Sequence, residues 1–405
     1  MKRLKTIVLV LVVLILISQL PFAYRRYKLG RLHAAIQQLN SQRKMEQSRD
    51  DTYAEYKGVI HVHSFLGGHS TGNFADIIAA ANANQLHFVI MTEHPSKDFD
   101  TAAMTLQGFH GGVLFVNGSE VVTANRDRLL VLPGNETAAV ANNSSTQDVL
   151  SQAKEKGALA FVAYPNEFKS WAVNGYDGVE VYNVFTSARR INPVITFCDS
   201  LWSYRSYPHL MFATFHTRPA EGLKQLDEAI VSRNAKLVAI AGNDAHANVG
   251  VTLSDSSGNT VLGIKLDPYE RSFRLVRMHV LLPREQPLTA ESLLVALHSG
   301  HCFIGFDLFG DTSGFRFSAS NGSENKIAGD EINLLNATRL SVKTAVNSRI
   351  VLLKNGTAAE ERNGLSTTDF GISEKGVYRV EVYLSQLPKP VSDQPWIISN
   401  PIYVR

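Results

Sequence analysis

The sequence predicts a β/α barrel domain that is preceded by one apolar helix and followed by an all-β domain. Between residues 58 and 302, short apolar runs alternate with helical segments, which is typical of parallel strands covered by helices. From about residue 303, strand-like runs follow one another across Asn-Gly and Glu-Lys-Gly turns, without an amphipathic helix between them. At the N-terminus, the run from Ile7 to Ile17 is apolar throughout.

Length and composition are those of a globular protein with more than one domain. The chain has 405 residues, of which 44% are hydrophobic and 19% are charged. The net charge of +3 is too small to indicate nucleic-acid binding, and no stripe of Lys and Arg with interleaved aromatic residues is visible. Cys198 and Cys302 are too few for a disulfide framework or a cysteine zinc site, and we expect two buried thiols rather than one disulfide.

Residues 1–29 predict a signal anchor. The 18 residues from Thr6 to Ala23 are just enough to span a bilayer, and Pro21 makes a poor signal-peptidase site. We therefore expect a membrane-anchored protein whose bulk is exported to a periplasmic or other extracytoplasmic space. A cleaved signal, which would release a secreted protein, is the alternative. Basic residues flank both ends of the run, so the positive-inside rule determines the orientation only weakly.

Residues 30–57 predict a short helical stalk. The apolar residues Leu32, Ile36 and Leu39 follow an i, i+4, i+7 pattern in an otherwise polar segment. We expect this segment to act as a spacer between the membrane and the first folded domain.

Residues 58–302 predict the barrel. About seven strands within about 190 residues indicate a closed or nearly closed β/α barrel, with an open doubly wound sheet as the alternative. The predicted strands are 58–63, 87–92, 113–119, 129–132, 158–163, 178–182 and 237–241, and the predicted helices are 73–84, 146–156, 194–202 and 219–233.

Residues 303–405 predict a small antiparallel β-sandwich. The predicted strands are 315–319, 338–344, 350–354, 376–382 and 396–404.

Candidate metal ligands follow the predicted strands of the barrel. The C-terminal ends of barrel strands converge on one mouth, so ligands that are far apart in sequence become neighbours there. His61 and His63 are two residues apart and would point the same way on a strand. The complete candidate set is His61, His63, His69, His94, Glu120, Asp244 and His246.

This set predicts two divalent metal ions. Seven nitrogen and oxygen ligands exceed what one four-coordinate zinc ion needs, and Glu120 is a natural bridging carboxylate. Zinc, manganese and iron all accept such ligands. Two-metal sites generate hydroxide near neutral pH and clamp the attacking and leaving oxygens of phosphoryl transfer.

The order of these motifs resembles the PHP superfamily, named for polymerase and histidinol phosphatase. The matching motifs between residues 58 and 302 are H-x-H-x5-H from His61, T-E-H ending at His94, S-E ending at Glu120 and D-A-H from Asp244. The resemblance implies a distorted seven-stranded barrel with a phosphoesterase-type site. It further implies that one ion is held by His61, His63, Glu120 and Asp244 and a second by His69, His94 and His246.

The chain departs from the family pattern at two places. Tyr164 stands where the family usually has a histidine before proline, and Arg126-Asp127-Arg128 replaces another histidine. We therefore expect a dinuclear site, unless Asp127, Tyr164 or Glu167 supplies replacement oxygens.

The overall layout is similar to the subgroup that contains carbaryl hydrolase. That subgroup also has an exported start, a PHP barrel and a C-terminal sandwich, here expected to be immunoglobulin-like. This similarity widens the expected substrates from phosphoesters to carboxylic and carbamate esters.

The expected reaction is attack of a metal-bound hydroxide on the phosphorus or carbonyl carbon of a small-molecule ester. We expect Tyr164 to bind substrate or support the ligands, Arg189 to bind an anionic group, and His216 or a water to assist the leaving group as an acid. A His216 that supports a ligand or is merely buried is the alternative. The alternative function is a non-catalytic metal-containing barrel that binds an envelope ligand or partner.

Overall fold

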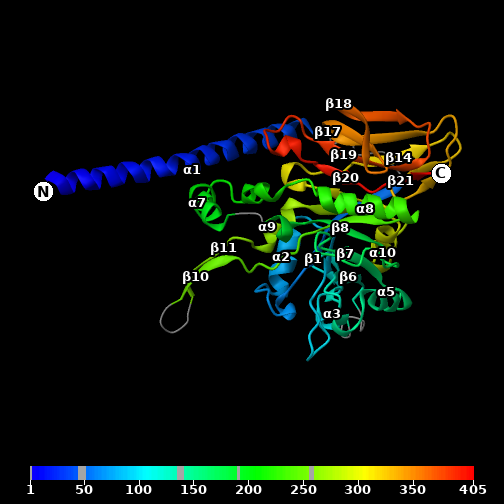
Figure 1. Ribbon diagram of the computed structural model, residues 1–405, viewed down its shortest axis with the longest axis horizontal. Helices are drawn as coiled ribbons and strands as arrows, with labels where there is room; N and C mark the ends of the chain where they lie inside the picture. Colours follow the sequence, from blue (N-terminus) through cyan, green and yellow to red (C-terminus); the bar gives the residue numbers. More distant parts are fainter. Residues whose placement is uncertain (1, 44–51, 135–140, 189–191, 255–259) are drawn as a thin grey trace.

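The computed structural model describes residues 2–43, 52–134, 141–188, 192–254 and 260–405. It is a mixed α/β structure with two large sheets and one long N-terminal helix that projects from the body (Figure 1). Helix α1 (Lys2–Gln42) is followed by strands and helices in alternation, and strands prevail after α10 (Ala290–His298). The prediction of an α/β chain that ends in strands is therefore confirmed at this level.

The first sheet runs through both halves of the chain. Its parallel core is β1 (Tyr53–Val62), β2 (Phe88–Met91) and β4 (Val113–Val116). On the other edge, β1 pairs antiparallel with β12 (Arg277–Pro283), a strand that the sequence pattern did not indicate. Strand β1 thus starts earlier than residue 58, because its polar first half is stabilised by pairing with β12.

The second sheet has the order β5-β6-β7-β8-β9. Its strands are β5 (Ser119–Val122), β6 (Arg128–Leu132), β7 (Leu159–Ala163), β8 (Gly178–Asn183) and β9 (Val238–Gly242). Strands β7, β8 and β9 are parallel as predicted, but β6 is antiparallel to both neighbours. The difference arises because only five residues join β5 to β6, which allows a hairpin but no crossover helix.

Four predicted helices are present close to their expected bounds. They are α2 (Phe74–Ala83), α5 (Thr146–Glu155), α7 (Pro193–Ser203) and α8 (Ala220–Arg233). The side chains of Asn73 and Ser145 cap the first two by accepting a hydrogen bond from the backbone three residues later. Helices α2 and α5 thus follow from local signals, namely a cap and an apolar stripe.

The C-terminal strands continue the first sheet. Strand β13 (Cys302–Gly305) pairs with β12 on one edge and with β20 (Ile397–Ser399) on the other. The expected domain boundary between residues 302 and 303 thus falls inside a strand. Both cysteines are free, and Cys302 is buried as expected whereas Cys198 is partly exposed. The remaining strands are β14 (Arg316–Ser320), β15 (Asn325–Ile327), β16 (Glu331–Ile332), β17 (Arg339–Lys354), β18 (Thr357–Gly371), β19 (Gly376–Tyr383) and β21 (Ile402–Val404).

Helix α1 combines an exposed apolar half with a packed polar half. Its most apolar window has a mean hydropathy of 2.6 and is not buried at all, so the helix is long and apolar enough to cross a membrane, as a signal sequence also would be. Leu32, Ile36 and Leu39 are buried in the main core. This segment is helical as expected, but its apolar stripe packs against the body, so it does more than separate the body from the apolar half of the helix.

A buried ion network joins β1, β12 and the segment after β13. His279 contacts Glu55 at 2.8 Å and Asp307 at 3.3 Å. Its geometry would also suit a metal ion, since His279, Asp307 and Asp311 have ligand atoms within 4.8 Å of one another. Basic side chains already neutralise these carboxylates, because Arg277 pairs with Asp307, Arg316 with Glu55, and Lys57 and Arg43 with Asp311. We interpret the cluster as a structural ion network.

We expect the stability of the fold to fall as the pH rises from 6.5 to 9. Burial alone would lower the pKa of His279, but the carboxylates of Asp307 and Glu55 raise it to about 9. Protonated His279 therefore stabilises the fold fully below pH 6.5, and this stabilisation, at most about 3 kcal/mol, is lost as the pH passes through 9. Thermal unfolding of the wild type and of His279→Gln at several pH values checks this. If the stability of both proteins changes equally with pH between 6.5 and 9, His279 is not the group responsible.

Candidate metal centre

The centre is assembled where β1 ends. The register between β1 and β2 shifts between Ile60 and Val62, and His61 in between has a φ of 67°. His61 thus occupies a bulge with left-handed backbone, a conformation that non-glycine residues rarely adopt. His63 follows the strand, and the two rings lie 5.1 Å apart. The residues do come together, but through the bulge rather than through a regular two-residue alternation.

The loop after β9 runs beside this strand end. Asn243 donates its backbone N–H to the carbonyl of Ile60, and Ala245 donates to the carbonyl of His61. Asp244 between them also has a positive φ, of 46°. This backbone pairing carries the carboxylate of Asp244 to the imidazoles of β1.

The start of β5 supplies the third side of the centre. The backbone N–H of Glu120 donates to the carbonyl of Glu93 at 3.2 Å, and isolated bridges join Glu93 to Ser119 and Val62 to Ala245. The two large sheets therefore meet on both sides of the centre.

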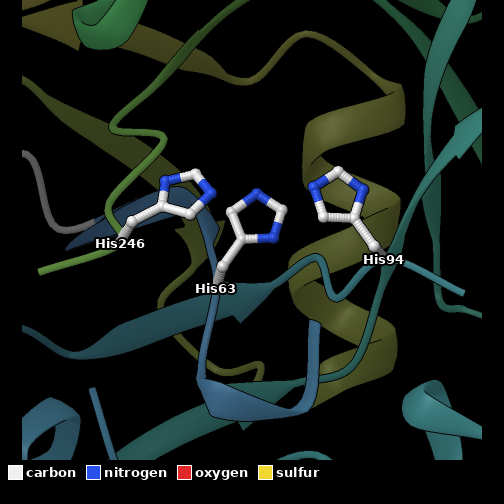
Figure 2. A group of neighbouring side chains, drawn as sticks. All are labelled: His63, His94 and His246. Atoms are coloured by element: carbon white, nitrogen blue, oxygen red, sulfur yellow. The ribbon is translucent and has the colours of Figure 1, made fainter. Parts of the chain in front are cut away.

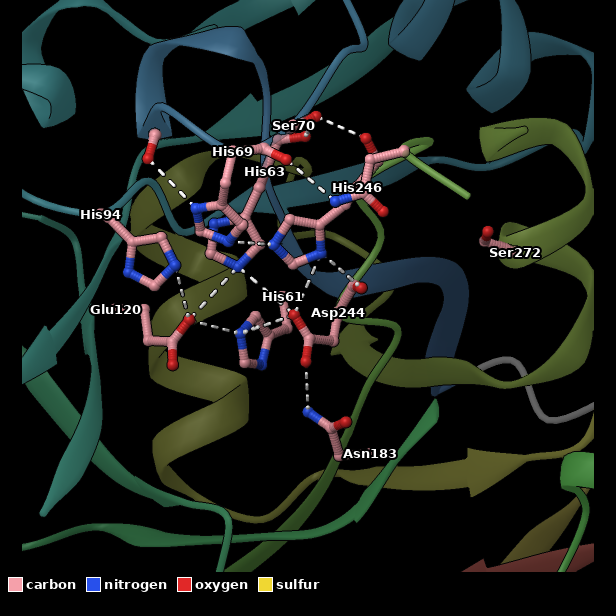
Figure 3. Close-up of polar contacts among 12 residues, drawn as sticks. His61, His63, His69, Ser70, His94, Glu120, Asn183, Asp244, His246 and Ser272 are labelled. Carbon is pink, nitrogen blue, oxygen red and sulfur yellow. Dashed lines mark hydrogen bonds and ion pairs between the residues drawn. The ribbon is translucent and has the colours of Figure 1, made fainter. Parts of the chain in front are cut away.

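One group of four buried side chains can hold a metal ion. The ligand atoms of His61, His63, Glu120 and Asp244 all lie within 4.8 Å of one another. The Oε2 atom of Glu120 is 3.1 Å from Nε2 of His61 and 3.3 Å from Nε2 of His63 (Figure 3). This group has the same four residues as the set expected for the first ion.

A second group consists of three histidines. Ligand nitrogens of His63, His94 and His246 lie within 4.8 Å of one another, and the rings of His94 and His246 stack on either side of His63 (Figure 2). His69 adjoins this group, because its Nε2 atom is 2.7 Å from Nε2 of His246. The structure thus brings all seven predicted ligands together, with His63 common to both groups.

Unpartnered buried atoms indicate that a ligand belongs in the centre. Three buried atoms make no hydrogen bond within the described part of the chain. They are the two ring nitrogens of His63 and the Oδ1 atom of Asp244. Leaving a buried polar atom without a partner costs about 1–3 kcal/mol. Coordination of a divalent cation would satisfy these atoms, so the residues present fit a metal.

The electrostatics of the histidines also fit metal binding. Burial lowers the pKa of His63 and of His94 to about 4, and it lowers the pKa of His246 as well. These imidazoles are therefore neutral at physiological pH, which is the form that binds metal. His61 differs, because the neighbouring carboxylates outweigh its burial and raise its pKa well above 6.5. A cation in the centre would take over this compensating role.

The sequence analysis missed Glu180 and Asn183 on β8. The Oε1 atom of Glu180 lies 2.6 Å from Nδ1 of His61, and Asn183 donates to both Glu180 and Asp244. Glu180 approaches so closely because residue 242 is glycine, since a Cβ there would lie 1.7 Å from Oε1 of Glu180. A strand-end acid followed by asparagine was the available signal, but the contact depends on tertiary structure.

We expect Glu180→Gln to weaken metal binding about 10–100-fold, the effect typical of partners that orient a ligand histidine. The amide keeps the volume but loses the charge that fixes the tautomer and the orientation of His61. Competition with a chelator measures the affinity, and Glu228→Gln on the exposed face of α8 is the matched control. An affinity within twofold of the wild type would show that Glu180 does not orient His61.

Tyr164 supports a ligand in the structure. Its hydroxyl donates to Oδ2 of Asp244 at 2.5 Å, and its own φ is positive, at 49°. Asp127 is occupied elsewhere, because it accepts hydrogen bonds from the Thr146 hydroxyl and from the backbone of Lys169. Asp127 is therefore not available as the replacement ligand that was considered.

Of the other two predicted catalytic residues, only His216 lies in the described part of the chain, and its contacts there are not with the ligands. The described contacts of His216 are with the carbonyl of Pro395 and with the rings of Phe306 and Phe309. Burial lowers its pKa to about 4, so it is neutral and suited to packing rather than to acid catalysis. The acid role for His216 is thus corrected. Arg189 lies outside the described residues.

Arg128 is a cationic side chain at the edge of the centre that sequence reasoning did not single out. Its guanidinium lies 3.3 Å from Oε1 of Glu120 and 4.9 Å from the centre of the Tyr164 ring. The side chain is 35% exposed, so it can reach a bound anion while staying beside the ligands.

Comparisons with known proteins add little. No family model matches the sequence, and no curated protein matches it. Among solved structures, seven chains match. One is the crystal structure of PsfC from Pseudomonas syringae PB-5123, with 12% sequence identity, a TM-score of 0.37, and coverage of 60% of this chain and 89% of that chain. A similarity at this level assigns neither a fold nor an activity.

Proposed function

We propose that this protein is a metal-dependent hydrolase that cleaves phosphoesters or related carboxylic and carbamate esters. The observation that carries the proposal is the convergence of seven ligand side chains on one centre, where buried polar atoms of His63 and Asp244 make no hydrogen bond. The resemblance to the PHP superfamily, and to its carbaryl hydrolase subgroup, agrees with this arrangement and supplies the expected reaction class.

The side chains around the ligands have distinct roles in this proposal. Two divalent ions, whether zinc, manganese or iron, would supply an activated water and neutralise charge on the ester oxygens. Glu180 orients His61, and Tyr164 holds Asp244 in place by its short hydrogen bond. Arg128 attracts and positions the anionic group of a phosphoester from the rim.

We further propose that the two sheets close into a distorted barrel and that the C-terminal strands form an immunoglobulin-like sandwich. The bridges from Val62 to Ala245 and from Glu93 to Ser119 support closure, because they join the sheets on both sides of the centre. The antiparallel pairing of β14, β17, β18 and β19 supports the sandwich.

We propose that α1 stays attached as a membrane anchor, with the remaining chain exported. Arg25 forms an ion pair with Asp199 at 2.8 Å, and Gln19 accepts a hydrogen bond from the indole of Trp202. Because these contacts tie the apolar half of α1 to the folded body, its removal would expose their partners.

The test uses the full chain in detergent with added manganese or zinc. We expect at least one bound metal ion per chain by elemental analysis, and hydrolysis of bis(4-nitrophenyl) phosphate that stops in the presence of a chelator. His63→Ala should abolish metal binding and hydrolysis, since the ring of His63 belongs to both ligand groups. Metal binding without any ester hydrolysis would favour the alternative, a non-catalytic binding module.

A further inference from the structure

We propose that the substrate is an amphiphile held in the surface of the membrane, so that an ester or phosphoester at its head enters the metal centre while its alkyl chain stays in the lipid. This inference rests on the proposed hydrolase and on the proposed anchor. Helix α7, which packs against α1, and the apolar side chains near the ligands carry it.

Helix α7 lies beside α1 at the end of the apolar run. Trp202 of α7 donates its indole N–H to the side chain of Gln19 at 2.9 Å. Gln19 is two residues after Ile17, which is about 3 Å along the helix axis. One to two turns later, Arg25 pairs with Asp199, and Arg26 donates to the Ser206 hydroxyl. If the segment from Thr6 to Ala23 spans a bilayer, Gln19 lies about 6 Å inside its edge whereas Arg25 and Arg26 lie just outside it, so these contacts hold α7 at the boundary between the acyl chains and the lipid headgroups.

The outer face of α7 is apolar where a soluble helix would be polar. Phe197 and Leu201 are one turn apart on the same face, and they are 50% and 72% exposed. Trp202 on the same helix is a residue type enriched at membrane interfaces. Basic residues of α1 at this level, among them Arg25 and Lys28, suit the phosphates of lipid headgroups. A lipid surface is therefore the occupant that fits this face.

Exposed apolar side chains also occur close to the ligands, in space or in sequence. Helix α6 (Val184–Ala188) directly follows β8, and its Phe185 is 42% exposed with its ring 6.4 Å from the ring of His246. Val249, three residues after His246, is 51% exposed, and Phe65, two residues after His63, is 50% exposed. Phe185 thus places an exposed apolar ring beside a ligand of the centre, which suits an alkyl chain next to the scissile ester.

The mouth and α7 lie on the side of the anchor. Helix α7 and the ribbon of β10 (Gly250–Ser254) and β11 (Thr260–Lys265) lie toward the end of the molecule from which the N-terminal half of α1 projects (Figure 1). Strand β10 begins four residues after His246, and Asn248 between them donates to the backbone of His69. The site and the membrane-facing helix are therefore on the same side of the body.

A first experiment tests the membrane contact without using activity. The full chain is reconstituted in phosphatidylcholine–phosphatidylglycerol vesicles with brominated acyl chains. We expect quenching of a tryptophan signal that is missing in Trp202→Phe, since that residue would lie at the lipid interface. No quenching of the Trp202 signal, or a change of oligomeric state in Phe197→Ser/Leu201→Ser, would assign the α7 face to a protein partner and overturn the proposal.

A second experiment tests the substrate class with two esters that share one scissile bond. Hexadecyl 4-nitrophenyl phosphate is presented in vesicles, and methyl 4-nitrophenyl phosphate in solution, both with manganese or zinc. We expect the ratio of the two rates to fall about tenfold in Phe197→Ser/Leu201→Ser, because two apolar anchors are lost. The control Val295→Ser/Leu335→Ser removes two exposed apolar side chains elsewhere and should leave the ratio unchanged.

The two proposals fail in different ways. In one outcome, the wild type hydrolyses the methyl ester while Phe197→Ser/Leu201→Ser has the same ratio of hexadecyl to methyl ester rates as the wild type. In that case the substrate assignment is overturned and the hydrolase proposal stands. If the wild type hydrolyses neither ester with metal bound, the phosphoesterase proposal is overturned and the substrate assignment falls with it.

Discussion

Replacing Glu120 by glutamine is expected to reduce hydrolysis about 10³-fold or more and to lower the metal content. The carboxylate of Glu120 is the point that the imidazoles share, since its Oε2 atom lies within 3.4 Å of Nε2 of His61, His63 and His94. Although burial alone would raise the pKa of Glu120, His61 and His63 lower it well below 4.5, so the side chain is an anion. Glutamine keeps the shape but removes the charge that would bridge two cations, a loss of about 4 kcal/mol in transition-state stabilisation.

Elemental analysis and the rate with bis(4-nitrophenyl) phosphate measure the two effects in the same preparation. Glu291→Gln, on the exposed first turn of α10, makes the same chemical change away from the centre and should keep the wild-type metal content and rate. A Glu120→Gln protein that retains full metal content and activity would exclude Glu120 as a ligand.

Local signals in the sequence predicted most of the helices and the central strands. Helix α2 was expected over residues 73–84 and is present over Phe74–Ala83, because a cap residue and an apolar stripe define it without help from the rest of the chain. Strand β12 was not expected, since its pairing with β1 joins segments more than 200 residues apart. The packing of the stalk was not expected for the same reason, because only the folded body reveals what covers Leu32 and Ile36.

The ligands of the candidate site were easier to predict than their support. Histidines and acids directly after strands can be recognised by residue type and position, and the seven named residues do meet. The bulge at His61 and the approach of Glu180 past Gly242 depend on backbone geometry that no short motif encodes. His216 was misplaced because its surroundings, Phe306 and Phe309, come from a segment about 90 residues later.

A second buried charge network joins the two halves of the chain. Arg379 on β19 donates two hydrogen bonds to Asp227 on α8 and one to Glu381 on its own strand. Arg218 makes a bidentate contact with the same Glu381, at 2.7 and 2.8 Å. Although burial alone would raise the pKa of Glu381, Arg218 and Arg379 lower it to about 2, so that this carboxylate stays charged in the interior. Arg379 is therefore the charge on which the packing of α8 against the C-terminal strands depends.

Arg379→Met is expected to destabilise the protein by about 3–5 kcal/mol, which is a large part of the stability of an ordinary domain. Methionine fills the space but leaves Asp227 without its buried partner and Glu381 with one arginine instead of two. The midpoint of chemical denaturation of the full chain in detergent measures the effect.

The control is Arg274→Met, which removes a half-exposed ion pair with Glu270 and should cost no more than about 1 kcal/mol. Adding Asp227→Asn to Arg379→Met should recover part of the loss, because the damage comes from the uncompensated charge of Asp227 rather than from lost volume, while Glu381 keeps its pair with Arg218. A double variant that is less stable than Arg379→Met would show that hydrogen bonding, not charge balance, joins the two halves.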